Sequence, residues 1–333
     1  MSLRRTIMMY GVPVLAIIAG CAKPSANLPP APVAIMEDSS ISVVSNQATL
    51  YGTLELPAHS FPVPVALIIA GSGPTDRNGN SRALPGANNS LRYLARGLAE
   101  RGIASLRYDK RGIGASAAAM GKEQDLRFDH FVGDAKSWIA QLRSDPRFST
   151  ITVVGHSEGS LIGMIAAREA GADAFVSLEG AGRNAKDVIA AQLSTQLPEN
   201  VVNNVKDMMR KIEAGEKVDS VPPMLAPLLR PSVQPYLASW FKYTPSSEIA
   251  KLTVPSLVVQ GTTDIQTSVE DAKLLADGHA NARLFTIEGM NHVLKAASGN
   301  MAAQMPSYSD PALPVVPQLL DEVATFIKSA RKR

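Results

Sequence analysis

Short apolar runs alternate with amphipathic helical patterns along most of this sequence, and this alternation limits the fold more than any other feature. The runs include "FPVPVALIIAGSG" at 61–73, "TITVVG" at 150–155 and "AFVSLEG" at 174–180. Apolar residues at helical spacing occupy 91–102, 128–145 and 160–171. Continuous apolar runs are typical of strands buried on both faces of a parallel sheet. The order therefore predicts an α/β protein with a doubly wound, mainly parallel sheet.

The pattern begins with a pair of β-prone runs and is interrupted near its middle. Two runs between Ser40 and Pro57 are separated by "SNQ", which predicts an antiparallel pair ahead of six further strands. Residues 184–250 have helical patterns and proline clusters without a clear strand. We predict one eight-stranded sheet formed by residues 39–183 and 251–333, with a helical insertion at 184–250 between the sixth and seventh strands.

The first 38 residues lie outside this pattern. Two arginines precede an apolar run at about 7–20, which is shorter than the roughly 20 residues of a membrane-spanning helix and predicts an export signal. The run closes with "IAGC", which resembles bacterial lipoprotein signals, whose cysteine is lipidated; the alternative is an ordinary signal with an incidental cysteine. The resemblance implies a signal peptide and lipidated Cys21 at 1–21 and a Pro/Ala-rich tether at 22–38. It also implies an exported protein anchored by lipid in the bacterial cell envelope, at the outer membrane facing the periplasm.

Composition excludes several classes of function. The formal net charge of +3 is too small to indicate nucleic-acid binding. Cys21 is the only cysteine, so no intramolecular disulfide can form. The sequence has no Cys/His cluster, and the glycines of the serine turn considered next do not form G-x-G-x-x-G. We therefore expect neither a metal nor another cofactor; none of these features predicts the oligomeric state.

A serine lies in a glycine-rich turn within "TVVGHSEGSLIGMIAA" at 152–167. A serine hydroxyl is a weak nucleophile, so a catalytic serine needs exposure and a base within hydrogen-bond reach. A sharp strand-to-helix turn gives that exposure and requires small residues two positions before and after the serine, which Gly155 and Gly159 provide. Ser157 is the candidate nucleophile; the alternative is a glycine-rich turn with a bystander serine.

One of the histidines is expected to act as the base. The candidates are His59, His130, His156, His279 and His292. His156 adjoins the serine and is expected to point away from it on a tight turn. His292, in "IEGMNHVLK", follows the last strand at the carboxyl edge of the sheet, where ligand sites of such folds gather. We therefore predict that His292 is the base.

That histidine needs a carboxylate to orient its ring. Asp264, in "GTTD", follows the seventh strand at the same edge of the sheet. The chain order is then serine, acid, histidine, as in one known arrangement of such triads. Glu179, which follows the sixth strand, is the competing acid. The predicted triad consists of Ser157, Asp264 and His292.

A tetrahedral intermediate needs backbone N–H donors directed at its oxyanion. We expect one donor from Glu158, the residue after the serine at the start of the helix. We expect the other from the loop "GSGPTDRNGN" at 71–80, after the third strand. Ser72 is the first choice in that loop and Gly73 the alternative.

Five ordered motifs between about residues 40 and 330 resemble those of the α/β-hydrolase superfamily. They are "GSGPTDRNGN" after the third strand, "LRYDKRGIGAS" after the fourth, "GHSEGS" at the serine, "GTTD" after the seventh and "MNH" after the eighth. The nearest resemblance is to bacterial carboxylesterases grouped with lysophospholipase-like and serine-aminopeptidase-like hydrolases. It implies cleavage of carboxylic esters through an acyl-enzyme on Ser157, without a cofactor.

The resemblance also has a structural part and one departure. It places Asp109, Arg111, Gly112 and Gly114 in a structural loop beside the active site, so they are not expected to be catalytic. The family's usual His-Gly after the third strand is replaced here by "AG" at 70–71. This departure concerns the second oxyanion donor.

The insertion at 184–250 lies where this superfamily keeps its lid. Its aromatic residues Tyr236, Trp240 and Phe241 are candidates for contact with a small ester that has an uncharged acyl or alcohol group; the alternative is that they form the core of the lid. Arg77 is a further substrate-binding candidate, with a salt bridge that fixes its loop as the alternative. Thioesterase, lysophospholipase and peptidase activities, and a non-catalytic envelope binding protein, are the competing functions.

Overall fold

The structure is a computed structural model that describes residues 39–84, 86–298 and 300–332. The expected signal peptide, Cys21 and the tether lie outside those residues. Within the described ranges, no helix combines the length and apolar character needed to cross a membrane.

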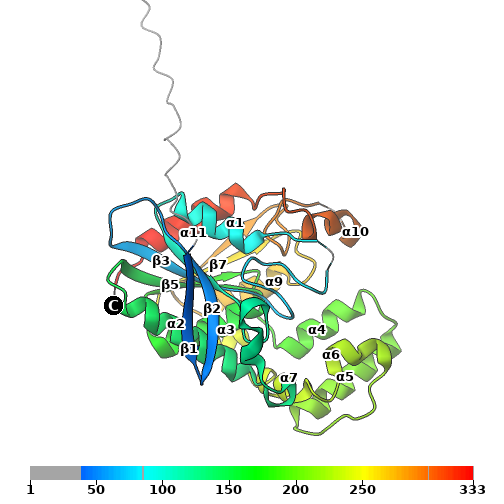
Figure 1. The fold of residues 1–333 in the computed structure, drawn as a ribbon. Helices are drawn as coiled ribbons and strands as arrows, with labels where there is room; N and C mark the ends of the chain where they lie inside the picture. The colour runs from blue at the N-terminus through cyan, green and yellow to red at the C-terminus, as the bar shows by residue number, and fades with distance from the viewer. Residues whose placement is uncertain (1–38, 85, 299, 333) are drawn as a thin grey trace, which may run out of the picture. The chain divides into compact units, whose positions relative to one another are not determined.

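An eight-stranded sheet forms the centre of the described structure, in the order β1-β2-β4-β3-β5-β6-β7-β8 (Figure 1). β2 pairs antiparallel with β1 and β4, and every later pair is parallel. The predicted eight-stranded, mainly parallel sheet is confirmed. The strands are β1 (Ser39–Ser45), β2 (Ala48–Glu55), β3 (Val63–Ile69), β4 (Ala104–Tyr108), β5 (Phe148–His156), β6 (Ala174–Leu178), β7 (Ser256–Gly261) and β8 (Ala282–Ile287).

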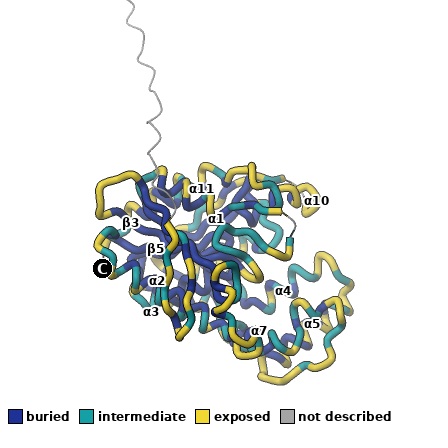
Figure 2. Tube along the Cα trace, viewed as in Figure 1, coloured by how far each residue is buried: buried dark blue, intermediate teal, exposed yellow. Residues whose placement is uncertain are grey.

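The central strands are built from apolar and β-branched residues that are covered on both faces. In β3 (VPVALII) all residues but Pro64 are buried, and in β5 all but Ser149 are buried. Figure 2 shows these strands as the buried interior, with exposed turns around them. The strands β3 to β8 are parallel to one another, so their carboxyl ends lie at the same edge of the sheet. The loops that follow these strands gather at that edge.

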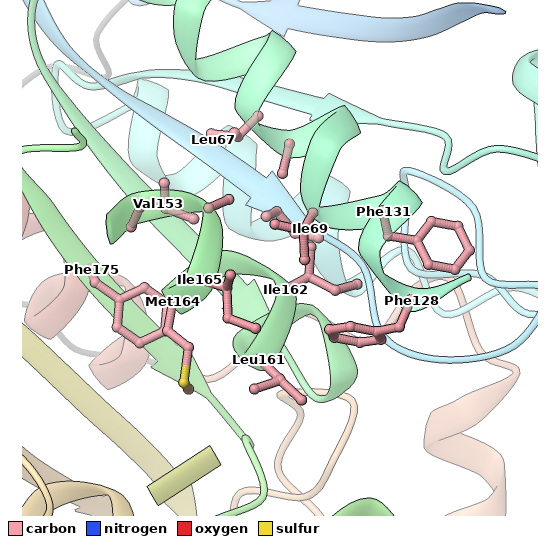
Figure 3. Close-up of a cluster of buried hydrophobic side chains, with 14 of the residues drawn as sticks. Leu67, Ile69, Phe128, Phe131, Val153, Leu161, Ile162, Met164, Ile165 and Phe175 are labelled. Atoms are coloured by element: carbon pink, nitrogen blue, oxygen red, sulfur yellow. The ribbon is translucent and has the colours of Figure 1, made fainter. Parts of the chain in front are cut away.

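Helices cover both faces of the sheet. On one face lie α2 (Phe128–Ser144), α3 (Glu158–Ala170) and α9 (Val269–Asp277), and on the other lie α1 (Ser90–Ala99) and α11 (Pro317–Ser329). Each face has its own apolar cluster; Figure 3 shows part of the first, with Leu161 and Ile162 of α3 near Phe128 of α2. The short elements are η1 (Gly114–Met120), η2 (Glu123–Asp125), α10 (Met301–Gln304) and η4 (Met305–Tyr308).

The insertion between β6 and β7 is helical, as predicted, and we call residues 184–250 the lid. Its helices are α4 (Ala185–Ser194), α5 (Glu199–Glu213), η3 (Pro223–Leu225), α6 (Ala226–Leu229), α7 (Gln234–Trp240) and α8 (Pro245–Ile249). Figure 1 shows α4 to α7 to one side of the sheet. Asn184 joins the two ends of the lid, because its Nδ2 donates to the carbonyl oxygens of Phe241 (2.7 Å) and Tyr243 (3.1 Å). The Tyr243 hydroxyl also donates to Asp129 of α2 at 2.5 Å.

Candidate active site

Ser157 lies at the sharp turn between β5 and α3. Its backbone has φ 54° and ψ −122°, outside the regions that residues other than glycine normally occupy, and it is half-buried. A Cβ on Gly155 would lie 2.2 Å from the carbonyl oxygen of Gly159, and a Cβ on Gly159 would lie 2.3 Å from that of Ile69. The turn therefore excludes any side chain at these two positions, which is the requirement that the sequence spacing indicates.

His292 and Asp264 meet at the carboxyl edge of the strands. His292 Nδ1 lies 2.7 Å from Asp264 Oδ2. Asp264 also accepts hydrogen bonds from the backbone N–H groups of Gln266 (2.6 Å) and Thr267 (3.1 Å) and from the Thr267 hydroxyl (2.8 Å). Burial alone would raise the pKa of Asp264, but the charge of His292 and these hydrogen bonds hold it well below its ordinary value. This contact turns Nδ1 of the ring towards the carboxylate of Asp264 and Nε2 away from it.

Glu179, the competing acid, contacts Asp264 through its buried carboxyl group. Its fully buried carboxyl accepts from the backbone N–H of Gly261 at 2.9 Å and from the side-chain amide of Gln260. Burial, together with the neighbouring charge of Asp264, raises the pKa of Glu179 well above its ordinary value, which disfavours its ionised form. In the described part of the chain, no group of three His, Cys, Asp or Glu side chains is arranged to hold a metal ion.

His156, which precedes the serine, supports the backbone of His292. Its Nε2 donates to the carbonyl oxygen of His292 at 2.7 Å, and the two ring centroids are 4.9 Å apart. Burial, with the charge of His292, lowers the pKa of His156 to about 3. The imidazole of His156 is therefore neutral, and it joins the end of β5 to the loop that follows β8.

A pocket with a free volume of about 90 Å³ lies at the serine. Ser72 and Glu158, the two predicted sources of oxyanion donors, border the same space as Ser157. The rest of the lining mixes polar and apolar side chains. From the lid come Ala185, Val188, Ile189, Gln192, Trp240 and Pro245, and from outside it come Leu161, Ala181, Arg183, Gln266 and Thr267. The structure thus brings three of the predicted catalytic-site residues to one cavity.

The three aromatic residues predicted from the lid have different positions. Trp240 lines the pocket and stacks on Phe128 with ring centroids 6.1 Å apart. Tyr236 is buried beneath it with its hydroxyl bonded to the Glu158 carboxylate, and Phe241 is buried in the apolar cluster. Tyr236 and Phe241 therefore pack in the apolar cluster, which is the alternative that the sequence left open, and Trp240 lines the pocket.

Arg77 is bound to Asp109 instead of lining the pocket. Its Nη2 lies 2.7 Å from Asp109 Oδ2, and its backbone N–H donates to Oδ1 at 2.9 Å. Asp109 also accepts from the backbone N–H of Ala115 at 2.8 Å. This pair joins the loop after β3 to the loop after β4, which is the alternative that the sequence left open for Arg77.

Sequence reasoning missed one buried residue of this site, Lys110. Its Nζ donates to Glu158 Oε2 at 2.8 Å and to the carbonyl oxygen of Gly71 at 2.6 Å. A lysine directly after the aspartate of "RYDKRG" is its only signal in the sequence. Lysine is almost never fully buried without a partner. The motif itself shows no such partner, so it does not indicate that the Lys110 side chain turns inward.

Residues 87–296 match the family described as serine aminopeptidase, S33. The match covers more than half of the chain and contains the serine turn, Asp264 and His292. The chain belongs to the S33 serine aminopeptidase family. In this S33 protein, the loop that carries Ser72 precedes the matched segment.

Relatives of this S33 protein include several esterases. Esterase EstD of Thermotoga maritima is 25% identical over 255 residues, which are 75% of this chain and 59% of EstD, so the chain spans about three fifths of that relative. Est1E from Butyrivibrio proteoclasticus has a TM-score of 0.54 at 17% identity, covering 87% of this chain and 96% of Est1E. The esterase domain of a Rhodothermus marinus protein has a TM-score of 0.56 at 15% identity, covering 89% and 99%. These structures confirm the α/β-hydrolase fold.

Proposed function

We propose that this S33 protein is a serine esterase that cleaves carboxylic esters through an acyl-enzyme on Ser157. The observation that carries the proposal is the 2.7 Å contact between His292 Nδ1 and Asp264 at the strand edge that also presents Ser157 in a strained turn. The similarity to EstD supports esters as the substrate class.

The proposed reaction follows from these positions. Ser157 Oγ attacks the ester carbonyl carbon while His292 Nε2 takes the hydroxyl proton, and ionised Asp264 stabilises the imidazolium. Backbone N–H groups of Glu158 and Ser72 donate to the oxyanion. The bond to the alcohol oxygen breaks as His292 returns the proton to it. Water, deprotonated by His292, then hydrolyses the acyl-enzyme and regenerates Ser157.

The pocket favours an uncharged, short acyl group over a peptide with a free amino end. Its one acidic lining residue is Glu158, and both carboxylate oxygens of Glu158 already accept hydrogen bonds, from Lys110 and Tyr236. Arg183 is likewise paired with Asp271 at 2.7 Å. No acidic side chain that lines this pocket is therefore left without a partner to bind a substrate ammonium. Est1E has been solved with ferulic acid, a small carboxylic acid, bound.

A fluorophosphonate probe tests the nucleophile, because it reacts with activated serines and needs little fit to a substrate. We expect labelling of the full chain in non-ionic detergent, mapped to Ser157, and loss of labelling in His292→Ala. Ser160→Ala is the matched control, since Ser160 is buried and bonded to Ser177 at 2.7 Å. It should still be labelled. Turnover of p-nitrophenyl acetate retained in Ser157→Ala would contradict the proposal.

We further propose that Cys21 carries the lipid that anchors this enzyme to the bacterial envelope. The support is the "IAGC" sequence that ends the apolar run. Mass spectrometry of the mature protein should find an acylated N-terminus at Cys21, and Cys21→Ala should release the protein from membranes with unchanged esterase activity. A mature chain that begins elsewhere and carries no lipid contradicts this proposal.

A further inference from the structure

Lys110 is a buried cation beside the proposed nucleophile, with its side chain 2% exposed. Its Nζ donates to Glu158 and to the carbonyl oxygen of Gly71, and it lies 5.2 Å from the ring centroid of Phe131. Burying an ammonium costs stability unless strong partners replace water. These contacts supply such partners, yet none of the steps proposed above uses the lysine.

The two polar partners of Lys110 belong to the two halves of the oxyanion site. Glu158 supplies one of the proposed N–H donors. Gly71 supplies the carbonyl of the peptide unit whose N–H belongs to Ser72, the other proposed donor. In a planar trans peptide the C=O and N–H groups point in opposite directions. Because Lys110 binds the Gly71 oxygen, the Ser72 N–H is turned away from the lysine.

The Gly71–Ser72 peptide lies directly against the nucleophile. A Cβ on Gly71 would lie 3.0 Å from Ser157 Cβ and 3.3 Å from His156 Nδ1. Ser72 borders the pocket together with Ser157. A small rotation of this peptide would therefore change where its N–H points relative to the reacting carbonyl.

We propose that Lys110 is a positioning residue that orients and polarises the Gly71–Ser72 peptide as an oxyanion donor. The inference rests on the proposed esterase function. A charged donor on the carbonyl oxygen fixes the peptide plane, and it strengthens the opposite N–H because hydrogen bonds in series polarise one another. Tyr236 of the lid bonds the other oxygen of Glu158, which keeps Glu158 Oε2 directed at Lys110.

The test removes the positive charge without leaving a buried carboxylate unpaired, in the double variant Lys110→Met with Glu158→Gln. We expect it to fold, because no buried charge is left alone. Its kcat for p-nitrophenyl acetate should fall about 10- to 100-fold, approaching the loss of one oxyanion donor, while KM changes little. Affinity for a trifluoromethyl ketone, which forms a tetrahedral adduct, should fall in parallel with kcat/KM.

The matched control is another acid–base pair, Arg143→Met with Asp173→Asn. Arg143 lies 2.9 Å from Asp173, which precedes β6 at the opposite edge of the sheet. This variant should lose stability and keep kcat. If the Lys110 double variant melts below the assay temperature, Lys110→Leu with Glu158→Gln takes its place, with the same expected loss, because leucine also lacks a donor for the Gly71 oxygen.

Three outcomes would overturn the inference. In the first, the double variant folds and its kcat and ketone affinity stay within about twofold of the parent values. Lys110 would then be only a structural partner of Glu158. In the second, KM of the double variant rises while kcat is unchanged, which would show that Lys110 contributes to binding of the substrate in its ground state instead. Failure of the proposed function is seen separately, in the parent protein, as absence of fluorophosphonate labelling at Ser157, and it removes the inference as well.

Discussion

At the scale of single residues, the serine turn depends on what is missing from its neighbours. Ser157 occupies a conformation that costs on the order of 1–3 kcal/mol and persists only where the surroundings enforce it. Gly155 and Gly159 make that possible, because backbone carbonyl oxygens fill the space of their absent side chains. The glycines are steric requirements of the turn, and their conformational freedom is secondary.

Gly159→Ala should destabilise the protein by about 1–3 kcal/mol, the usual cost of overpacking, and should slow fluorophosphonate labelling. The added Cβ can be accommodated only by moving backbone, 2.3 Å away at Ile69. Urea unfolding and labelling rates measure the two effects. Gly133→Ala, in α2 beside the flexible Asn46 side chain, is the control and should be neutral or stabilising. Equal effects at both glycines would contradict the steric account.

The carboxyl pair makes a second prediction, Asp264→Asn. An asparagine leaves His292 without a carboxylate to hold its Nδ1 proton, so kcat should fall by about 10³- to 10⁴-fold. Glu179 should not take over, because burial raises the pKa of its carboxyl and so disfavours the ionised form that the histidine needs. Asp277→Asn, at the exposed end of α9, serves as the control in the same esterase assay. Residual activity above a tenth of the parent rate would show that Glu179 replaces Asp264.

At the scale of elements, the lid both lines the pocket and contacts the serine turn. Helix α7 places Trp240 in the pocket wall and Tyr236 against Glu158, one turn apart. The same short helix therefore shapes the substrate space and supports the serine turn. Substitutions at these two positions should separate the two roles.

Trp240→Ala should shift the preference towards longer acyl chains. Removing the indole enlarges a pocket of about 90 Å³, and the ratio of kcat/KM for p-nitrophenyl octanoate to that for the acetate should rise about tenfold, within the range for added methylenes in apolar pockets. Met224→Ala is the control, since that lid side chain is 62% exposed. An unchanged ratio would mean that the acyl chain lies elsewhere.

At the scale of the whole molecule, two buried groups give stability opposite dependences on pH. The folded-state pKa of His156, about 3, lies below its ordinary value of 6.5, so the unfolded chain binds a proton that the folded one does not. Stability therefore falls as pH drops from about 6.5 towards 3. The pKa of Glu179 is raised, so its contribution weakens as pH rises above its ordinary 4.5.

His156→Gln isolates the first effect. The amide can still donate to the carbonyl oxygen of His292 but does not titrate. Between pH 6 and 4, the free energy of unfolding of the parent should fall more steeply than that of the variant, by up to about 1.4 kcal/mol per pH unit. Urea unfolding at a series of pH values measures both slopes. Identical slopes would mean that His156 is protonated in the folded state.

The sequence predicts much of this organisation, for a physical reason. Parallel strands end at one edge, so side chains that follow them in the chain, such as Asp264 and His292, converge without further information. The burial of the Lys110 side chain and the pairing of Arg77 with Asp109 depend on which loops contact each other. Contacts between loops produce no repeating pattern of apolar residues in the sequence, so they could not be predicted from it. For the same reason the lid aromatics were assigned by type, and only Trp240 of them reaches the pocket.

The junction at Asn184 has a consequence for how proteins of this kind diversify. One side-chain amide holds the outgoing and returning ends of the lid together, and the entropic cost of closing a loop grows only slowly with the number of residues in it. Gene segments that encode different helices can therefore be exchanged within that interval while the strands, and the loops that carry Ser157, Asp264 and His292, stay the same. If the proposed esterase function holds, such exchanges would change the pocket wall and leave the proposed triad in place.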